Sequence, residues 1–214
     1  MNKVKNTSKK KIGIVNYGMG NLGSVSNCIN LLGYRTFIAQ TPDDIASCDA
    51  LVLPGVGAFP AAMKNLQDLK LIKPIEKLIL DKQKPFLGIC LGLQMLAKKS
   101  FENIETNGLG WIEGNVIRFP EDQNIKIPHV GWNRVNLNQS NPISEGLDNF
   151  THFYFDHSYY LDITDDSSFA NCNYGLDFCV GLQKDNIFAV QFHPEKSQRN
   201  GLKFMRNFLN YVEE

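Results

Sequence analysis

Short apolar runs alternate with stretches of helical periodicity through the first half of the chain, a pattern typical of βαβ units with a parallel sheet. Four strands are predicted, at 11–17, 35–40, 50–55 and 85–90. The helices are predicted over 21–33, from Thr41 as N-cap with Pro42 in the first turn, around 74–82, and over 91–100. Because these strands are apolar on both faces, we expect them in the middle of a sheet that helices cover.

From about residue 108 the pattern changes to strand-like segments separated by turns, at 110–120, 125–137, 152–162, 177–185 and 186–195. An antiparallel extension of the parallel sheet is the simplest arrangement for them. The chain closes with a helix over 201–214, whose apolar stripe is formed by Leu202, Met205, Phe208, Leu209 and Val212. The predicted fold class is therefore α/β, with a central, mostly parallel sheet flanked by helices and an antiparallel extension.

The composition narrows the choice of partners and compartment. Lys+Arg and Asp+Glu both number 22 in 214 residues, so no broad basic field is available to hold nucleic acid or an anionic membrane. The five cysteines lack C-x-x-C spacing, which favours reduced thiols in the cytoplasm over disulfides or a zinc site. The basic opening, 1–10, is expected to be a disordered tail, and no later stretch is long enough to span a membrane. We expect one domain over 11–214.

Cys90 stands between two glycines in "LGICLGLQML", where an apolar strand gives way to a helix. The G-x-C-x-G spacing is that of a nucleophile elbow, a sharp turn that lifts the central side chain out of the sheet. The start of the following helix favours the thiolate, which is the nucleophilic form of cysteine. A buried structural cysteine is the alternative, and this stretch alone does not decide between the two.

A base and an orienting acid for this nucleophile are found in "VQFHPEKS". His193 follows the last apolar strand, and Glu195 lies two residues on, across Pro194, so both side chains can face one site. By itself the H-P-E stretch reads as a surface turn. Its position at a strand end, where open α/β sheets place their active sites, favours a catalytic role.

The third element is "PGVG", residues 54–57, directly after a central strand. A glycine-rich turn there can present backbone N–H groups to a developing oxyanion, and the N–H of Leu91 would be a second donor. An ordinary βα turn is the alternative. Together the three stretches supply nucleophile, base, orienting acid and oxyanion donors at the strand ends of one sheet.

Two other classes of protein are weighed against this interpretation. An α/β-hydrolase that uses cysteine would also carry an elbow, but there the acid precedes the histidine, whereas Glu195 follows His193. A non-catalytic binding module on the same fold would lack part of the triad, and all three members are present.

The stretches "PGVGAF", "LGICLGLQML" and "VQFHPEKS" resemble the three signatures of class I, triad-type glutamine amidotransferases. Within that family, "NYGMGNLGSV", "PHVGWN" and "FYFDHSYY" resemble the glutaminase subunits of imidazole glycerol phosphate synthases, from about residue 11 to the C-terminus. The resemblance implies a flavodoxin-like sheet and hydrolysis of glutamine to glutamate and ammonia, without a cofactor or metal.

Residue roles follow from the same resemblance. Cys90, His193 and Glu195 match the catalytic triad, and Gly57 and Leu91 match the oxyanion donors. The loop that contains Gly55 matches one that responds to the partner's ligand. The glutamine-binding positions of the family are matched by Gln94, His157, Ser158 and Tyr159.

The resemblance also implies a partner, because ammonia must reach its acceptor without being protonated in water. In the family, a (β/α)₈-barrel cyclase subunit receives it and forms imidazole glycerol phosphate and an aminoimidazole carboxamide ribotide (AICAR) in histidine biosynthesis. Positions that face this subunit are matched by Asn21, Trp132 and Lys196, whose alternative readings are a loop cap, a core aromatic and a solvated lysine. A paralogous glutaminase subunit that supplies ammonia to a surface-polysaccharide sugar amidotransferase is the alternative function.

Overall fold

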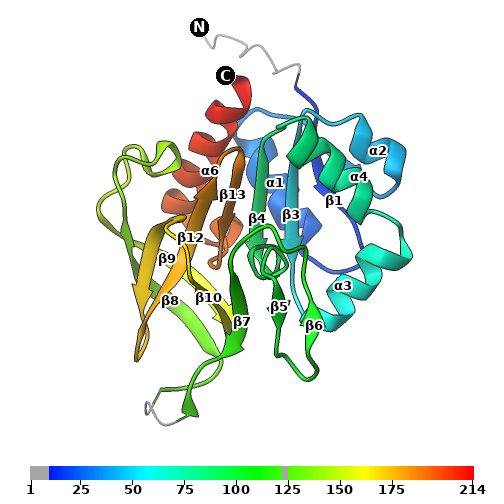
Figure 1. The fold of residues 1–214 in the computed structure, drawn as a ribbon. Helices are drawn as coiled ribbons and strands as arrows, with labels where there is room; N and C mark the ends of the chain where they lie inside the picture. The colour runs from blue at the N-terminus through cyan, green and yellow to red at the C-terminus, as the bar shows by residue number, and fades with distance from the viewer. Residues whose placement is uncertain (1–9, 122–124) are drawn as a thin grey trace, which may run out of the picture.

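A computed structural model describes residues 10–121 and 125–214, so the predicted disordered tail lies, except for Lys10, outside the described residues. Among the described residues nine strands form one sheet, in the order β2-β1-β3-β4-β13-β12-β11-β8-β9 (Figure 1). Their bounds are Thr36–Ala39, Ile12–Val15, Ala50–Gly55, Phe86–Cys90, Ile187–Val190, Asp177–Lys184, Ser168–Asn173, His129–Leu137 and Phe150–His157.

The first five strands of this order pair in parallel, and the remaining pairs are antiparallel. The parallel part has the 2-1-3-4-5 order of flavodoxin-like folds, with β13 as its fifth strand. The predicted fold class, a mostly parallel sheet with an antiparallel extension, is therefore confirmed. The placement of segment 186–195 in the antiparallel extension was wrong, because β13 pairs in parallel with β4.

A second sheet of four strands, in the order β10-β7-β5-β6, lies beside the carboxyl ends of the parallel strands (Figure 1). Its strands are Tyr159–Ile163, Gly114–Arg118, Lys99–Ser100 and Thr106–Asn107. The segment 152–162, predicted as one strand, is divided between the two sheets at Ser158: β9 pairs with β8, whereas β10 pairs with β7. The polar residues Asp156, His157 and Ser158 interrupt the apolar pattern at this point, but the prediction treated them as part of one strand.

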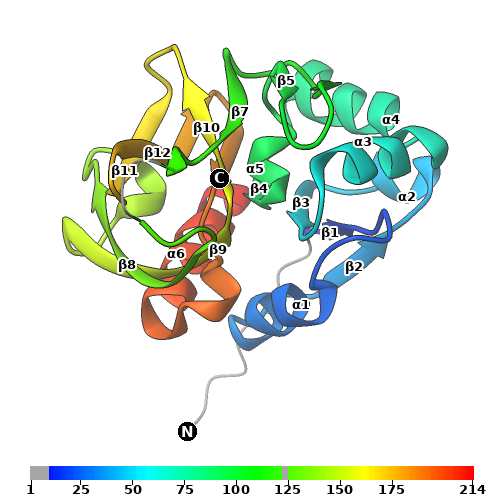
Figure 2. The ribbon, with the colours of Figure 1, turned by 90° about the horizontal axis from the view of Figure 1, so that it is seen from below.

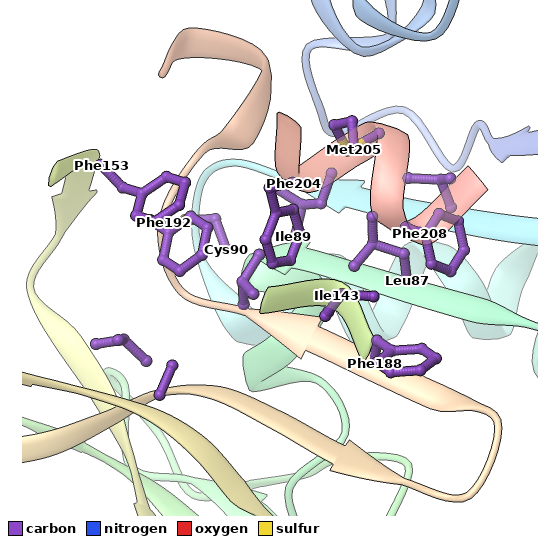
Figure 3. Close-up of a cluster of buried hydrophobic side chains, with 14 of the residues drawn as sticks. Leu87, Ile89, Cys90, Ile143, Phe153, Phe188, Phe192, Phe204, Met205 and Phe208 are labelled. Atoms are coloured by element: carbon purple, nitrogen blue, oxygen red, sulfur yellow. The ribbon is translucent and has the colours of Figure 1, made fainter. Parts of the chain in front are cut away.

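Helices cover both faces of the parallel part (Figure 2). The helices α1 (Leu22–Leu31) and α6 (Gln198–Glu213) pack on one face, and α2 (Pro42–Ala46), α3 (Phe59–Asp68) and α4 (Ile72–Glu76) pack on the other. On the α6 face, Phe192 stacks on Phe153 with ring centroids 4.0 Å apart, and Cys90 belongs to the same cluster (Figure 3). No helix in the described part of the chain is both long and apolar enough to cross a bilayer.

Several predicted elements differ in detail. The helix predicted around 74–82 is α4 followed by a π-helical turn, Lys77–Asp81, and α6 begins three residues before the predicted 201. The strand predicted over 110–120 is limited to β7. The helix α3 was not predicted, although its buried residues Phe59, Ala62, Met63 and Leu66 have helical spacing.

The helix predicted over 91–100 was wrong beyond Gln94, because α5 spans only Leu91–Gln94. The next residues use their backbone groups elsewhere: the carbonyls of Met95 and Leu96 accept from Leu109 and Trp111, respectively. Lys99–Ser100 then becomes β5 of the small sheet. Tertiary strand pairing has therefore replaced the local helical preference.

Candidate active site

Cys90 lies at a sharp turn between β4 and α5. Its backbone has φ +56° and ψ −108°, a conformation that residues other than glycine rarely adopt. The glycines on both sides make the turn possible: a Cβ at Gly92 would lie 1.9 Å from the carbonyl oxygen of Leu53, and one at Gly88 would lie 2.8 Å from the carbonyl oxygen of Gly92. The structure thus has the strand-to-helix turn that the G-x-C-x-G spacing predicts.

His193 is brought to Cys90 by strand pairing, because β13 runs parallel to β4 and both strands end on the same side of the sheet. His193 Nδ1 lies 2.8 Å from Oε1 of Glu195, and both side chains are buried. An ionised carboxylate only accepts hydrogen bonds, so Nδ1 carries a proton. The ring also interacts with the Cys90 side chain, for which Nε2 is the remaining nitrogen.

The surroundings of His193 favour its protonated form. Burial by itself lowers its pKa, but the charge of a Cys90 thiolate, the interaction with that sulfur and the Glu195 carboxylate together raise the pKa to about 10. A protonated imidazole beside a thiolate is the ion pair that a cysteine nucleophile uses. The pair therefore combines an attacking group with a proton donor.

The loop after β3 lies against the nucleophile turn. Gly55 is the register partner of Cys90 in the β3–β4 pair, and Gly57 has φ +103°. A Cβ at Gly55 would lie 2.4 Å from the Tyr17 hydroxyl and 2.8 Å from Cβ of Leu91. Glycine at this position therefore lets the loop backbone approach Leu91 without an intervening side chain.

A cavity of about 290 Å³ opens beside Cys90. It brings together most of the residues that the sequence placed in the substrate and oxyanion sites: Gly57, Cys90, Leu91, Gln94, His157, Ser158 and Tyr159. Gly55 and His193 are buried next to Cys90 but do not line the cavity. These residues come from the ends of β3 and β4 and from the β9–β10 junction, so the division of 152–162 between two sheets forms one wall of the cavity.

Sequence reasoning missed further lining residues, among them two carboxylates. Asp156 and Glu102 both line the cavity, and Oε2 of Glu102 accepts a hydrogen bond of 2.7 Å from the N–H of Phe59 at the start of α3. Glu102 lies in the loop after β5, beyond the helix predicted over 91–100, and no pattern pointed to it. Among the described residues no group of three or more His, Cys, Asp and Glu is arranged to hold a metal ion.

A buried pair of glutamine side chains supports the nucleophile. The register of β13 and β4 places Gln191, which is fully buried, beside Cys90, and its Nε2 donates to the Cys90 sulfur at 3.6 Å. Its Oε1 accepts from Nε2 of Gln94 at 3.1 Å. Gln191 was not identified from the sequence, although it precedes the H-P-E stretch by two residues. Its apolar neighbours predicted that Gln191 lies in a strand, and they gave no sign of a role in the site.

The three residues predicted to face a partner lie at or near the surface. Asn21 is the N-cap of α1, and its side chain accepts from the N–H of Ser24, as in its alternative reading as a cap. Trp132 is 47% exposed on β8 and packs edge-on against Tyr154. The Lys196 ammonium lies 5.3 Å from the centre of the same tyrosine ring. Trp132 is therefore not a core aromatic, and it shares a surface cluster with Tyr154 and Lys196.

The fold and this site agree with one family of enzymes. The family model "Glutamine amidotransferase class-I" matches residues 14–211, and the chain belongs to this family. Two solved structures share the fold: a crystal structure of a glutamine amidotransferase (TM-score 0.74, 19% identity, 95% of this chain and 99% of that one) and PurLQS from Thermotoga maritima (TM-score 0.73, 18% identity, 96% and 100%).

Relatives of higher identity carry a more particular name, imidazole glycerol phosphate synthase subunit HisH. The protein named HisH 1 in Campylobacter jejuni strain RM1221 is 46% identical over 198 residues, which cover 92% of this chain and 98% of the relative. The HisH subunit of Aquifex aeolicus is 46% identical over 203 residues, 94% of this chain and 97% of its own. HisH 2 of Vibrio vulnificus strain YJ016 is 44% identical over 203 residues, 94% and 95%.

Proposed function

We propose that this chain is the glutaminase subunit of an imidazole glycerol phosphate synthase, acting in histidine biosynthesis. The observation that carries the proposal is the arrangement of Cys90, His193 and Glu195 at the edge of an amino-acid-sized cavity, with His193 held by Glu195 at 2.8 Å. The names of the relatives support the particular synthase.

The chemistry follows from the charges of the site. The Cys90 thiolate attacks the side-chain amide carbon of glutamine, and the carbonyl oxygen becomes an oxyanion that we expect the N–H groups of Gly57 and Leu91 to bind. Protonated His193 gives its proton to the departing ammonia, which leaves a γ-glutamyl thioester on Cys90. His193 then takes a proton from water, the water attacks the thioester, and glutamate is released with the thiolate restored.

The cavity offers groups that match both ends of glutamine. Both hydrogens of the Gln94 amide nitrogen are used within the protein, by Tyr159 O at 2.8 Å and Gln191 Oε1 at 3.1 Å. Its Oε1 is therefore the atom that Gln94 offers to a ligand. The Glu102 carboxylate suits the positively charged α-amino group, and Ser158 and Tyr159 also line the cavity.

Ammonia that escaped into water at neutral pH would be protonated and lose the lone pair with which it attacks. We therefore infer a second subunit that covers the site and receives ammonia directly, a (β/α)₈-barrel cyclase. The surface cluster of Trp132, Tyr154 and Lys196, together with Asn21 at the start of α1, is proposed as part of the docking surface. The loop that contains Gly55 is proposed to transmit the partner's ligand state to the site, which is allostery between two sites.

We also propose that residues 11–214 form one domain, which works in the cytoplasm. Strands from both halves of the chain share the large sheet, and the family model spans 14–211, which supports a single unit. The five cysteines are unpaired and buried, as expected for a protein kept in a reducing compartment.

The deciding experiment measures glutamate release by the purified chain alone, with the cyclase subunit, and with the cyclase subunit plus its phosphoribulosyl ligand. We expect weak turnover alone and strong stimulation by the complete combination. Turnover that the cyclase leaves unchanged would retain the glutaminase assignment but reject this partner in favour of a sugar amidotransferase. The absence of any turnover, under conditions where the chain is folded, would reject the glutaminase assignment itself.

A further inference from the structure

Two buried histidines stand at the ends of the outer strands β8 and β9, next to the glutamine cavity. His129 begins β8 and His157 ends β9, where they are register partners, and His129 Nδ1 lies 2.9 Å from His157 Nε2. The exposed fractions are 2% for His129 and 6% for His157. The mechanism above uses neither ring as an acid or base, so their contact requires another explanation.

The proton positions of this pair follow from the partners at its two ends. His157 Nδ1 lies 2.8 Å from the carbonyl oxygen of Tyr159, which can only accept, so this nitrogen carries a proton. At the other end, Nδ2 of Asn133 lies 3.2 Å from His129 Nε2. The orientation of the Asn133 amide is set by two further bonds, because its Nδ2 donates to Asn173 O at 3.1 Å and its Oδ1 accepts from Arg134 N at 2.7 Å.

His129 Nε2 therefore faces a donor and accepts. A neutral His129 then carries its proton on Nδ1 and donates to His157 Nε2, which leaves His157 neutral as well. Both rings have the Nδ1-protonated tautomer, and all four ring nitrogens have a partner within the protein. His157 has no ring nitrogen left for a substrate, so its ring contributes to the cavity only as a surface.

The surroundings of the pair favour this uncharged state. His129 is stacked between Phe155 and Tyr174, with ring centroids 4.6 Å and 4.0 Å away, and Phe119 and Phe178 pack against His157 at 5.3 Å and 5.7 Å. Burial lowers the pKa of His129 to about 4 and that of His157 to about 3. Among these aromatic rings, water cannot replace the hydrogen bond between His129 Nδ1 and His157 Nε2.

The carbonyl at the inner end of the pair also holds a residue of the cavity. Tyr159 O accepts from His157 Nδ1 and from Gln94 Nε2, both at 2.8 Å, so both of its lone pairs are used. Gln94 in turn bonds to Gln191, whose Nε2 reaches the Cys90 sulfur. A continuous series of hydrogen bonds thus runs from Asn133 on β8, through the two histidines, to the nucleophile.

We propose that His129 and His157 are positioning residues: as a neutral, donor-to-acceptor pair they fix the Tyr159 carbonyl and, through it, the orientation in which Gln94 presents its oxygen to glutamine. This role rests on the proposed glutaminase function. The ring nitrogens act through the Tyr159 carbonyl and Gln94, and neither is assigned a bond to the substrate.

Two substitutions at one position separate this role from simple packing. His129→Phe keeps a ring between Phe155 and Tyr174 but removes the donor to His157. His129→Asn loses the ring but places an amide N–H near the former Nδ1, where it can donate to His157. We expect His129→Phe to raise the KM for glutamine about tenfold, the effect of one lost hydrogen bond, and His129→Asn to recover most of that loss.

The assay uses the full chain with the cyclase subunit present, and urea unfolding of each variant reports its stability. A His129→Phe variant with the KM of the wild type, beside an impaired His129→Asn, would show that the ring serves packing and would overturn the proposal. Nitrogen-15 NMR of ring-labelled histidines in the unmutated chain is the second test, and it does not depend on whether the variants fold. We expect both rings to be neutral and protonated on Nδ1 at neutral pH.

A His157 ring protonated on Nε2, or doubly protonated, would overturn the proposal. The NMR result stands whether or not the chain hydrolyses glutamine. A correct tautomer pair in a chain that releases no glutamate would therefore locate the failure in the proposed function, whereas active enzyme with the wrong tautomers would locate it in the histidine pair.

Discussion

The hydroxyl group of Tyr17 donates a hydrogen bond of 3.0 Å to the carbonyl oxygen of Pro54, linking the segment after β1 to the end of β3. Burial, and to a smaller extent the charge of Cys90, raise the pKa of Tyr17, so the phenol keeps its proton and donates. The bonded carbonyl belongs to the peptide that leads into Gly55. This contact therefore holds the start of the loop whose Gly57 is proposed to bind the oxyanion.

Replacing Tyr17 by phenylalanine removes this bond and keeps the ring. We expect kcat for glutamine hydrolysis to fall about fivefold, equivalent to roughly 1 kcal/mol, while KM stays within about twofold, because the loop acts on the transition state. Steady-state kinetics and urea unfolding measure the two effects separately. An unchanged kcat with a lowered stability would mean that the hydroxyl only supports the fold.

Replacing Cys90 by alanine removes the nucleophile. We expect glutamine turnover to fall by about 10³-fold or more while the fold is kept. Cys48→Ala is the matched control, since Cys48 is also buried but lies outside the cavity, and its loss is expected to lower stability without changing turnover. Mass spectrometry of the acyl-enzyme checks the assignment: a glutamyl adduct on the Cys90→Ala protein would contradict it.

Replacing Glu195 by glutamine removes one of the groups that raise the pKa of His193. We expect turnover to fall on the order of 10²-fold, because the ring loses its orienting partner and part of its proton affinity. The alkaline limb of the profile of kcat/KM against pH is expected to move to lower pH. A profile that keeps its alkaline limb would count against the carboxylate as the tuning group.

The raised pKa of His193 also makes the free energy of unfolding depend on pH. The pKa of His193 is raised from its ordinary 6.5 to about 10, so the folded chain holds this proton more tightly than the unfolded chain. The resulting stabilisation is complete below about pH 6.5 and is lost as the pH rises through about 10. In Glu195→Gln the free energy of unfolding should therefore decline less steeply over this range, which urea titrations at several pH values measure.

Two glycines give opposite predictions for stability. Gly92→Ala puts a Cβ 1.9 Å from the carbonyl oxygen of Leu53, so we expect a loss of about 3 kcal/mol or more, or failure to fold. Gly23→Ala lies on the exposed side of α1 with no atom within 4 Å of the new Cβ, so we expect a gain of roughly 0.5–1 kcal/mol. The urea midpoints of both variants measure these changes in stability. Equal changes for Gly92→Ala and Gly23→Ala would show that the turn does not require the close approach of Gly92 to Leu53.

Local patterns were sufficient for four of the five parallel strands and for the motif residues, whereas β13 was expected in the antiparallel extension. The strands around Cys90 and before His193 are short apolar runs, and the residues at their ends meet because parallel strands end on one side of a sheet. Both histidine and cysteine stand at such ends. The sequence therefore predicted that both residues lie at strand ends, but the order of strands that makes β4 and β13 neighbours came only from the structure.

The same patterns failed where long-range pairing competed with local preference. The stretch after Gln94 has helical periodicity, but its backbone bonds to residues 109–111 and its end joins the small sheet. The stretch 152–162 reads as one strand, but it leaves one sheet and enters another at Ser158. In both places the pairing partner is distant in the sequence, whereas periodicity is read from a short stretch of neighbouring residues.

The sequence by itself determined the sheet's central strands, the nucleophile turn with its two glycines, and the pairing of His193 with Glu195, because each depends on residues close together in the chain. Only the tertiary structure decided the cavity wall at Glu102, the Gln191 bond to Cys90 across 101 residues, and the histidine pair that supports Tyr159. Those contacts depend on strand register between distant segments, and register is set by the packing of the whole sheet.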